Sequence, residues 1–275
     1  SYPRVLLGFS GWMDGGDVST GTINLLIEKL GAEKIAEIKP DSFYLYSFPG
    51  SMELTALFRP HTRIKEGLIK SYELPTNMFF CSEKDNLILF NGKEPNINWS
   101  EFADCIFELC NKCGVRNIYF IGSVAGLVPH TREPRLFCSV SNPQLKDKLV
   151  HYGVKFSNYE GPASIVTYLT SRATEYSVDM VSFVSAIPAY VQGYNPKCIE
   201  AVIRRLAGIL ELQIDLDNLR VISDSFEKKL SNVVQEQPEL ADRIRKLEED
   251  YDNEIFNNEM GDLKKWLQEK GVRLD

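Results

Sequence analysis

His130 and Arg132 have the side-chain types and the spacing that acid–base chemistry on an anion would need. Histidine titrates near neutral pH and can act as a general base, and arginine offers a two-pronged donor to a carboxylate or phosphate. Thr131 stands between them, in a loop that opens with glycine at Gly122. The same residues fit a second interpretation equally well, in which this is a glycine-rich surface loop and His130 only bonds a backbone carbonyl.

A second glycine-rich segment, residues 11–17, follows a short apolar run near the start of the chain. Its glycines are Gly11, Gly15 and Gly16. These glycines would let backbone amides approach an anionic ligand at a helix start. However, the two common glycine-rich nucleotide-binding motifs, Gly-x-x-x-x-Gly-Lys-Ser/Thr and Gly-x-Gly-x-x-Gly, are absent. Asp14 and Asp17 would also repel a phosphate unless a cation bridged them. We favour the alternative of a tight strand-to-helix turn with a capping aspartate and a buried Trp12.

Two further loops carry polar side chains in comparable positions. Glu160 and Gly161 precede a predicted helix, where a carboxylate could act as a base or could simply complement the helix dipole. Tyr190 follows an apolar strand and could line a pocket or an interface. Residues in such positions are more often structural than catalytic.

All four loops are expected at one edge of a sheet. Residues 5–9 and 117–122 are short and almost wholly apolar, which is typical of strands buried on both faces, and each run leads into one of the glycine-rich loops. Open α/β sheets place their sites at the carboxyl ends of such strands. If the loops form one binding site, six side chains should converge in one cleft: Trp12, Asp14, His130, Arg132, Glu160 and Tyr190.

Strand-like and helix-like segments alternate over the first two-thirds of the chain, which predicts an α/β fold with a mixed, mostly parallel sheet. Asp17 or Ser19 is expected to cap a helix that ends at Leu30. Further strands are predicted at residues 64–70, 78–81, 87–90, 136–140 and 180–185, some of them antiparallel because no helix fits between them. Further helices are predicted at residues 99–113, 142–151, 162–176 and 196–212.

The C-terminal part of the chain predicts helices with narrow apolar stripes and heavily charged outer faces. Pro238 separates two such stripes, and we expect an antiparallel helical hairpin that docks on the core or on a neighbouring subunit. Gly261 should precede a final short helix around Trp266. We therefore divide the chain into an α/β core, residues 1–216, and an acidic helical extension, residues 217–275.

The charge of the chain argues against a nucleic-acid partner. The net charge is −7, and residues 213–275 hold 16 acidic against 10 basic side chains. No dense run of lysine and arginine offsets this charge, so a phosphate backbone would be repelled. No stretch approaches the roughly 20 apolar residues that span a bilayer, so we expect no membrane partner either.

Metal, redox and serine-hydrolase chemistry have little support in the sequence. The three histidines are scattered and no paired Cys-x-x-Cys exists, so we expect no metal and assign no cofactor. Cys110 and Cys113 form a single Cys-x-x-Cys at the C-terminal end of a predicted helix, whereas a redox pair would need a helix N-terminus to lower its thiol pKa. No Gly-x-Ser-x-Gly motif occurs. Six cysteines without a secretory leader indicate a cytoplasmic protein.

Taken as a set, these loops resemble the proteasome assembly chaperone family. The matching segments are residues 11–16, Arg59-Pro60, residues 128–132, 159–162, 188–191 and 212–216. Their order and spacing agree with the family from about residue 3 to residue 219. The chain looks like the bacterial-type members that carry a helical C-terminal extension. One departure is that Arg132 precedes Glu133, where many relatives have proline.

The resemblance implies a three-layer α/β/α fold like the phosphorylase/hydrolase-like class, and homo-oligomers, of which a trimer is one form. It leaves two functions open. The first is a non-catalytic homo-oligomeric assembly or scaffold protein with a protein partner, which the lack of a complete catalytic set favours. The alternative is an enzyme or sensor for a small anion or nucleotide, of the ATP-grasp-like ligase or phosphorylase/hydrolase-like kind, that uses the strand-end loops.

Overall fold

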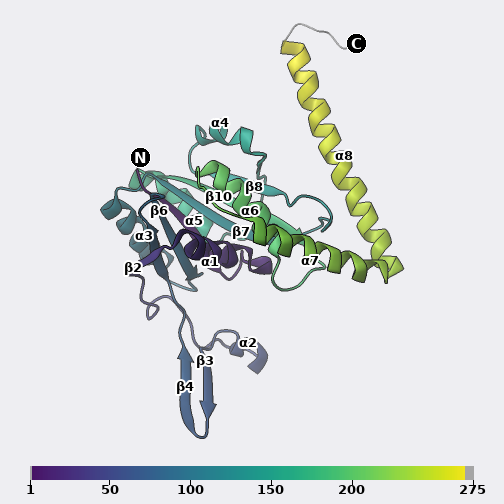
Figure 1. Ribbon diagram of the computed structural model, residues 1–275. Helices are drawn as coiled ribbons and strands as arrows, with labels where there is room; N and C mark the ends of the chain where they lie inside the picture. The colour runs from purple at the N-terminus through teal and green to yellow at the C-terminus, as the bar shows by residue number, and fades with distance from the viewer. Residues whose placement is uncertain (1, 270–275) are drawn as a thin grey trace.

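An eight-stranded mixed sheet forms the centre of the molecule, in the order β2-β5-β6-β1-β7-β10-β8-β9 (Figure 1). The computed structural model describes residues 2–269, apart from the side chains of residues 258, 259 and 261–269. The strands of the sheet are β1 (Arg4–Ser10), β2 (Glu33–Glu37), β5 (Met78–Ser82), β6 (Leu87–Lys93), β7 (Asn117–Gly126), β8 (Leu136–Val140), β9 (Lys155–Phe156) and β10 (Asp179–Pro188). Strands β6, β1, β7 and β10 run parallel, whereas β5 and β8 are antiparallel to their central neighbours. The predicted mixed, mostly parallel sheet is therefore confirmed.

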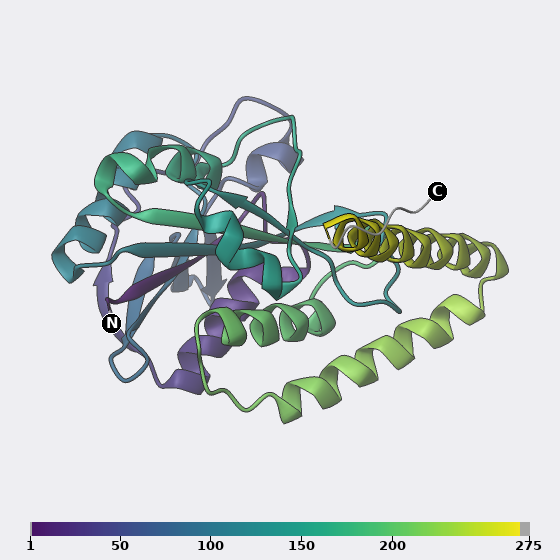
Figure 2. The same cartoon turned by 90° about the horizontal axis from the view of Figure 1, so that it is seen from above.

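Helices cover both faces of this sheet, which gives three layers (Figure 2). They are α1 (Val18–Leu30), α3 (Trp99–Cys113), α4 (Leu145–Leu149), α5 (Ile165–Arg172) and α6 (Pro196–Ile209). One apolar cluster joins the sheet to α1, α4 and α6, and a second joins its other face to α3 and α5. The sequence of strand β1 is apolar because both of its faces are buried. Leu6 faces the first cluster, and Val5 and Leu7 face the second.

The predicted helices differ from the observed ones mainly at their ends. Helix α3 has the predicted bounds, and Pro196 occupies the first turn of α6, where its missing amide hydrogen costs nothing. Helices α4 and α5 begin three residues later than predicted, and they end earlier because 3-10 turns follow them. The 3-10 turns are Gly15–Asp17, Val150–Tyr152 and Ala173–Tyr176.

A separate arm projects away from the sheet (Figure 1). It consists of helix α2 (Met52–Ala56) and a two-stranded antiparallel sheet of β3 (His61–Lys65) and β4 (Leu68–Glu73). The prediction of a single strand over residues 64–70 was wrong. The chain turns back at Glu66-Gly67, where both residues have positive φ angles of 52° and 74°.

The C-terminal extension consists of helix α7 (Asp217–Gln235) and helix α8 (Pro238–Glu269). Helix α7 lies along α6, and α8 turns away from it at a steep angle, so the two form an open corner rather than a close antiparallel hairpin (Figures 1 and 2). A separate final helix after Gly261 was wrongly predicted, because α8 continues through this glycine. The side chain of Trp266 lies outside the described part of the chain. Among the described helices, none is long and apolar enough to cross a membrane.

Candidate functional site

Asp14 closes the turn between β1 and α1. Its carboxylate accepts hydrogen bonds from the amide and the hydroxyl of Thr20, at 3.0 and 2.7 Å, and so satisfies a free amide at the helix start. Burial raises the pKa of this carboxyl, although the two bonds from Thr20 act in the opposite direction. A capping aspartate was predicted, but its assignment to Asp17 or Ser19 was wrong. Asp17 makes no capping bond, and the Ser19 hydroxyl bonds two strands instead.

Ser19 ties the first turn to the neighbouring strand. Its hydroxyl is fully buried; it accepts a hydrogen bond from the Phe9 amide at 3.0 Å and donates one to the Ile121 carbonyl at 2.5 Å. At the end of β7, the Ser123 hydroxyl donates to the Gly15 carbonyl at 2.6 Å. The turn after β1 and the end of β7 therefore lie together at one edge of the sheet.

Replacing Ser19 with alanine should lower the free energy of unfolding by about 2 kcal/mol, because two buried backbone groups lose their partner. Thr22 offers a matched control one turn later in α1. Its hydroxyl is buried and has no hydrogen-bond partner among the described residues, so Thr22→Val should be neutral or stabilising. Chemical denaturation of both variants checks this prediction. If the two variants lose the same free energy of unfolding, the prediction is contradicted.

Gly15 and Gly16 make room for neighbouring protein segments. A Cβ atom on Gly15 would lie 2.9 Å from Cδ1 of Ile187, and one on Gly16 would lie 2.9 Å from Cβ of Asn195. Gly16 also has a φ of 64°, which side chains rarely tolerate. The space that a side chain would need at these two glycines is therefore occupied by the end of β10 and the start of α6.

Trp12 lies on the surface with 65% of its area exposed, so the expectation that it is buried was wrong. Glu94 holds the backbone beside it. One of its carboxylate oxygens accepts from the Trp12 amide and the other from the Ile165 amide, both at 3.1 Å. Gly11, with a φ of 133°, packs against the same side chain. The sequence analysis missed Glu94, although its place directly after β6, a buried strand parallel to β1, is the signal that could have found it.

Three other predicted positions lie apart from these contacts. Glu160 and Gly161 are exposed just before α5. There the hydroxyl of Tyr159 donates to the carbonyl of Pro162 at 3.2 Å, which closes the loop on itself. Arg59 is exposed and follows α2 on the arm.

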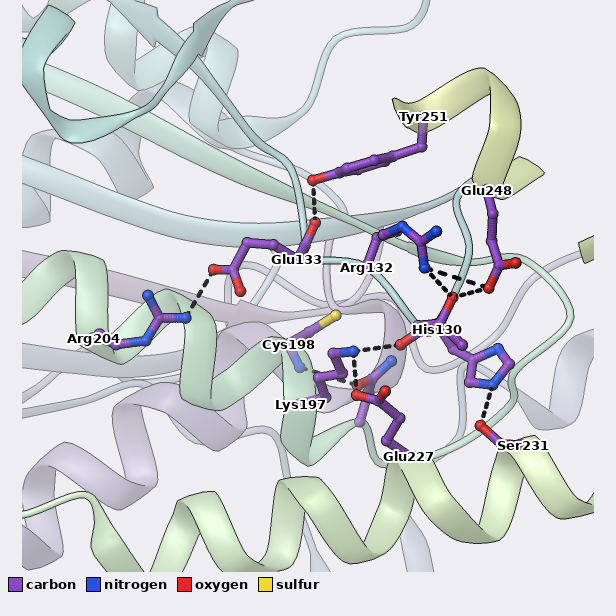
Figure 3. A network of polar contacts seen from close by, with 12 residues as sticks. His130, Arg132, Glu133, Lys197, Cys198, Arg204, Glu227, Ser231, Glu248 and Tyr251 are labelled. Atoms are coloured by element: carbon purple, nitrogen blue, oxygen red, sulfur yellow. Dashed lines mark hydrogen bonds and ion pairs between the residues drawn. The ribbon is translucent and has the colours of Figure 1, made fainter. Parts of the chain in front are cut away.

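His130 is almost fully buried, with 4% of its area exposed, and both of its ring nitrogens are engaged. Figure 3 shows the bond to Ser231. The Tyr190 hydroxyl accepts from the His130 amide at 2.8 Å and lies 2.9 Å from Nδ1, so it can donate its own proton there. Nε2 then carries the ring proton and donates to the hydroxyl of Ser231 on α7 at 3.1 Å. This arrangement fits a neutral imidazole.

Burial, and next the positive charge of Lys197, lower the pKa of His130. Unfolding restores the ordinary pKa of about 6.5, so the unfolded chain takes up a proton first as the pH falls. The contribution of His130 to stability is therefore complete above that pH and is lost as the pH falls toward the lower folded-state pKa. Between pH 8 and pH 5 the stability difference between wild type and His130→Asn should shrink, as melting curves across this range would show. A difference that stays constant or widens would contradict this assignment.

Thr131 and Arg132 are bound by the extension, and Figure 3 shows Arg132 beside Glu248. The Thr131 hydroxyl donates to the carboxylate of Glu248 on α8. Arg132 forms a two-pronged pair with Asp252, whose oxygens lie 2.8 Å from Nε and from Nη2. The hydrogen bond to Asp252 raises the pKa of Arg132 and lowers that of Asp252. The arginine expected to clamp an anion thus clamps a carboxylate of the same chain.

Lys197, at the start of α6, was missed by the sequence analysis. Its ammonium group donates to the His130 carbonyl at 2.5 Å and pairs with Glu227 on α7. A cavity of about 10 Å³ lies between these groups and is lined by His130, Arg132 and Cys198, among others. That is room for about one water molecule. Burial raises the pKa of the Cys198 thiol to about 12, so this sulfur stays protonated at neutral pH.

The arrangement is suited to holding acidic helices. His130, Arg132 and Lys197 all contact the extension, and the two cations pair with its carboxylates. Within the described residues, no group of three or more histidine, cysteine, aspartate or glutamate side chains could hold a metal ion. At the single Cys-x-x-Cys, burial raises the pKa of Cys110 to about 12, which makes its thiol a poor nucleophile.

Comparisons with known proteins agree on one family. A model described as the PAC2 family matches residues 8–234. A proteasome-assembly chaperone homologue from Mycobacterium tuberculosis superposes with a TM-score of 0.76 at 25% identity, over 88% of this chain and 99% of the other. No match was found among curated proteins.

Two structures of lower sequence identity show the same fold. A protein of unknown function from Mycobacterium tuberculosis superposes with a TM-score of 0.81 at 23% identity, over 95% of this chain and 86% of the other. An archaeal proteasome activator from Pyrococcus furiosus superposes with a TM-score of 0.61 at 22% identity, over 84% of this chain and 93% of the other. The resemblance stated from the sequence motifs is therefore confirmed at the level of the family.

Proposed function

The chain belongs to the PAC2 family, and on that premise we propose that it is a non-catalytic assembly or scaffold protein that works as a homo-oligomer and binds a protein partner. Solved relatives include a proteasome-assembly chaperone homologue and an archaeal proteasome activator. We carry over to this chain only the general role of binding another protein.

The observation that carries this proposal is the exposed apolar face of the arm. Ile64 and Ile69 are directly opposed across β3 and β4, and Tyr72 lies opposite Thr62 on the same face. The three apolar side chains are 62%, 70% and 60% exposed. A two-stranded hairpin is only marginally stable by itself in water, and contiguous apolar patches of this kind mark interaction sites. Burial against a second copy of the chain would stabilise the arm.

The alternative function, catalysis or sensing with a small anion, has less support. The loops that would form its pocket contain Asp14, His130 and Arg132, and each of these bonds another residue of the same chain. The cavity beside His130 is about 10 Å³, whereas ligand pockets are typically about 300 Å³ or larger.

Light scattering at micromolar concentration tests the proposal. We expect a mass that is a multiple of the chain mass of 31.3 kDa, with a trimer as one such form. A chain that stays monomeric would overturn the homo-oligomer. A thermal-shift screen with nucleotides and small anions separates the two functions, because a ligand of the folded state must raise the melting temperature. Stabilisation by one of these compounds would favour the alternative.

A further inference from the structure

Three basic side chains form a cluster that the proposed assembly does not use. They are Arg132 in the loop after β7, Arg135 just before β8, and Lys155 in β9, and we call them the basic rim. All three lie at the same end of the sheet, because β8 begins where its antiparallel neighbour β10 ends, and β9 runs parallel to β8. Their side chains are 33%, 16% and 33% exposed, so the cluster is partly withdrawn from water.

One short stretch of α8 covers the basic rim. Asp252 pairs with Arg132 through both oxygens, and Glu254 pairs with Arg135 at 2.5 Å and also with Lys155. Tyr251 directly precedes Asp252. Its ring stacks 4.3 Å from the Arg135 guanidinium, and its hydroxyl donates to the Glu133 carbonyl at 2.8 Å.

These contacts define what the basic rim recognises. Glu248 and Asp252 are four residues apart and therefore lie one helical turn apart on one face. Tyr251 and Glu254 extend the same contact surface. The complementary ligand is a helix with two carboxylates one turn apart, an aromatic ring beside them and a third carboxylate two residues later.

The fit of α8 leaves the basic rim partly unsatisfied. Nε of Arg135 is buried and has no hydrogen-bond partner among the described residues. Among the described side chains of α8, Glu254 is the last with an ion pair to the core, and Phe256 is 62% exposed. The far part of α8 projects from the core (Figure 1). A buried unpaired donor is costly, so a better-fitting acidic helix would gain a bond that α8 does not make.

We propose that the basic rim is a docking site for an acidic helix of a partner protein, and that α8 is its intramolecular occupant. The partner must displace α8, because both helices would pair with Arg132, Arg135 and Lys155. The docking site lies on a different surface from the arm. A failed test of the docking site would therefore not contradict the proposed assembly, and a failed test of the assembly would not contradict the docking site.

The test uses the full chain with α8 released by four substitutions: Tyr251→Ala, Glu248→Gln, Asp252→Asn and Glu254→Gln. The probe is a fluorescein-labelled peptide with the sequence of residues 238–258, and binding is measured by fluorescence anisotropy. We expect the released variant to bind the peptide at least about tenfold more tightly than wild type, because the tethered α8 competes at a high effective concentration. The affinity should fall as salt is added.

Two controls make the result specific. Adding Arg132→Gln, Arg135→Gln and Lys155→Gln to the released variant should abolish peptide binding. A peptide of the same composition in scrambled order should bind at least about tenfold more weakly, since it keeps the charge but not the helical spacing. No binding by the released variant, equal binding by wild type, or equal binding of the scrambled peptide would overturn the proposal.

Discussion

Replacing Ile64, Ile69 and Tyr72 with serine should raise the dissociation constant of self-association at least about a hundredfold. Burying a large apolar side chain contributes about 1.5–3 kcal/mol, and every 1.4 kcal/mol changes an affinity about tenfold. Losing even the partial burial of three such side chains should therefore raise the dissociation constant by more than a hundredfold in total. Sedimentation velocity over a concentration series measures the change. Below the concentration at which the chain assembles, the melting temperature should stay the same, because these side chains are 60–70% exposed.

A matched control carries three substitutions at scattered sites of similar exposure. Tyr2, Leu127 and Val150 are 64%, 83% and 57% exposed and lie outside the arm. Changing them to serine should leave the dissociation constant within about tenfold of wild type, because each surface substitution away from special contacts changes free energies by about 0.5 kcal/mol or less. If the control variant dissociates as readily as the arm variant, the assembly does not depend on the arm.

Replacing Tyr251 with alanine should release α8 from the core. The tyrosine is 8% exposed and contributes the ring contact with Arg135 as well as the hydrogen bond to Glu133. Removing a buried aromatic side chain costs about 3 kcal/mol, and this loss falls on the docking of one helix. Backbone amides of residues 248–254 should then exchange with solvent about a hundredfold faster, because local opening sets the exchange rate.

Tyr251→Phe serves as the control for this variant. It keeps the ring and its contact with Arg135 and removes only the hydrogen bond to the Glu133 carbonyl, which should cost about 1 kcal/mol. The exchange of residues 248–254 should then rise by only about fivefold. If Tyr251→Ala leaves their exchange unchanged, the docking of α8 does not depend on this residue.

The sequence predicted those parts of the fold that depend on local patterning. The strand at residues 117–122 and helix α3 follow directly from apolar runs and from the helical spacing of Phe102, Ile106 and Cys110. The placement of the glycine-rich loops at one edge also follows, because β1 and β7 are parallel neighbours. The strand and the helix need no knowledge of distant contacts, whereas the shared edge depends on the parallel pairing of β1 with β7.

The arm was missed because apolar side chains are normally read as core. Ile64, Leu68 and Ile69 look like a buried strand in the sequence, yet all three are at least 60% exposed. The Glu66-Gly67 turn between them was the local signal, since glycine readily adopts the positive φ that a two-residue hairpin requires. Exposure itself depends on where the arm leaves the sheet, which no local pattern encodes.

The occupation of the candidate site by the extension was equally unpredictable. Arg132 and Asp252 are 120 residues apart in sequence, and their pairing depends on the corner between α7 and α8. The acidic charge of the extension was visible in the sequence, but the matching basic rim was not, because Arg132, Arg135 and Lys155 are spread over three elements.

Hydrogen exchange of the arm, measured below and above the concentration at which the chain assembles, tests the central claim most directly. We predict that amides of residues 61–73 exchange at least about tenfold more slowly in the assembled state, because burial of the apolar face stabilises β3 and β4. Amides of residues 130–135 should exchange equally at both concentrations. Arm exchange that does not depend on concentration would contradict the account.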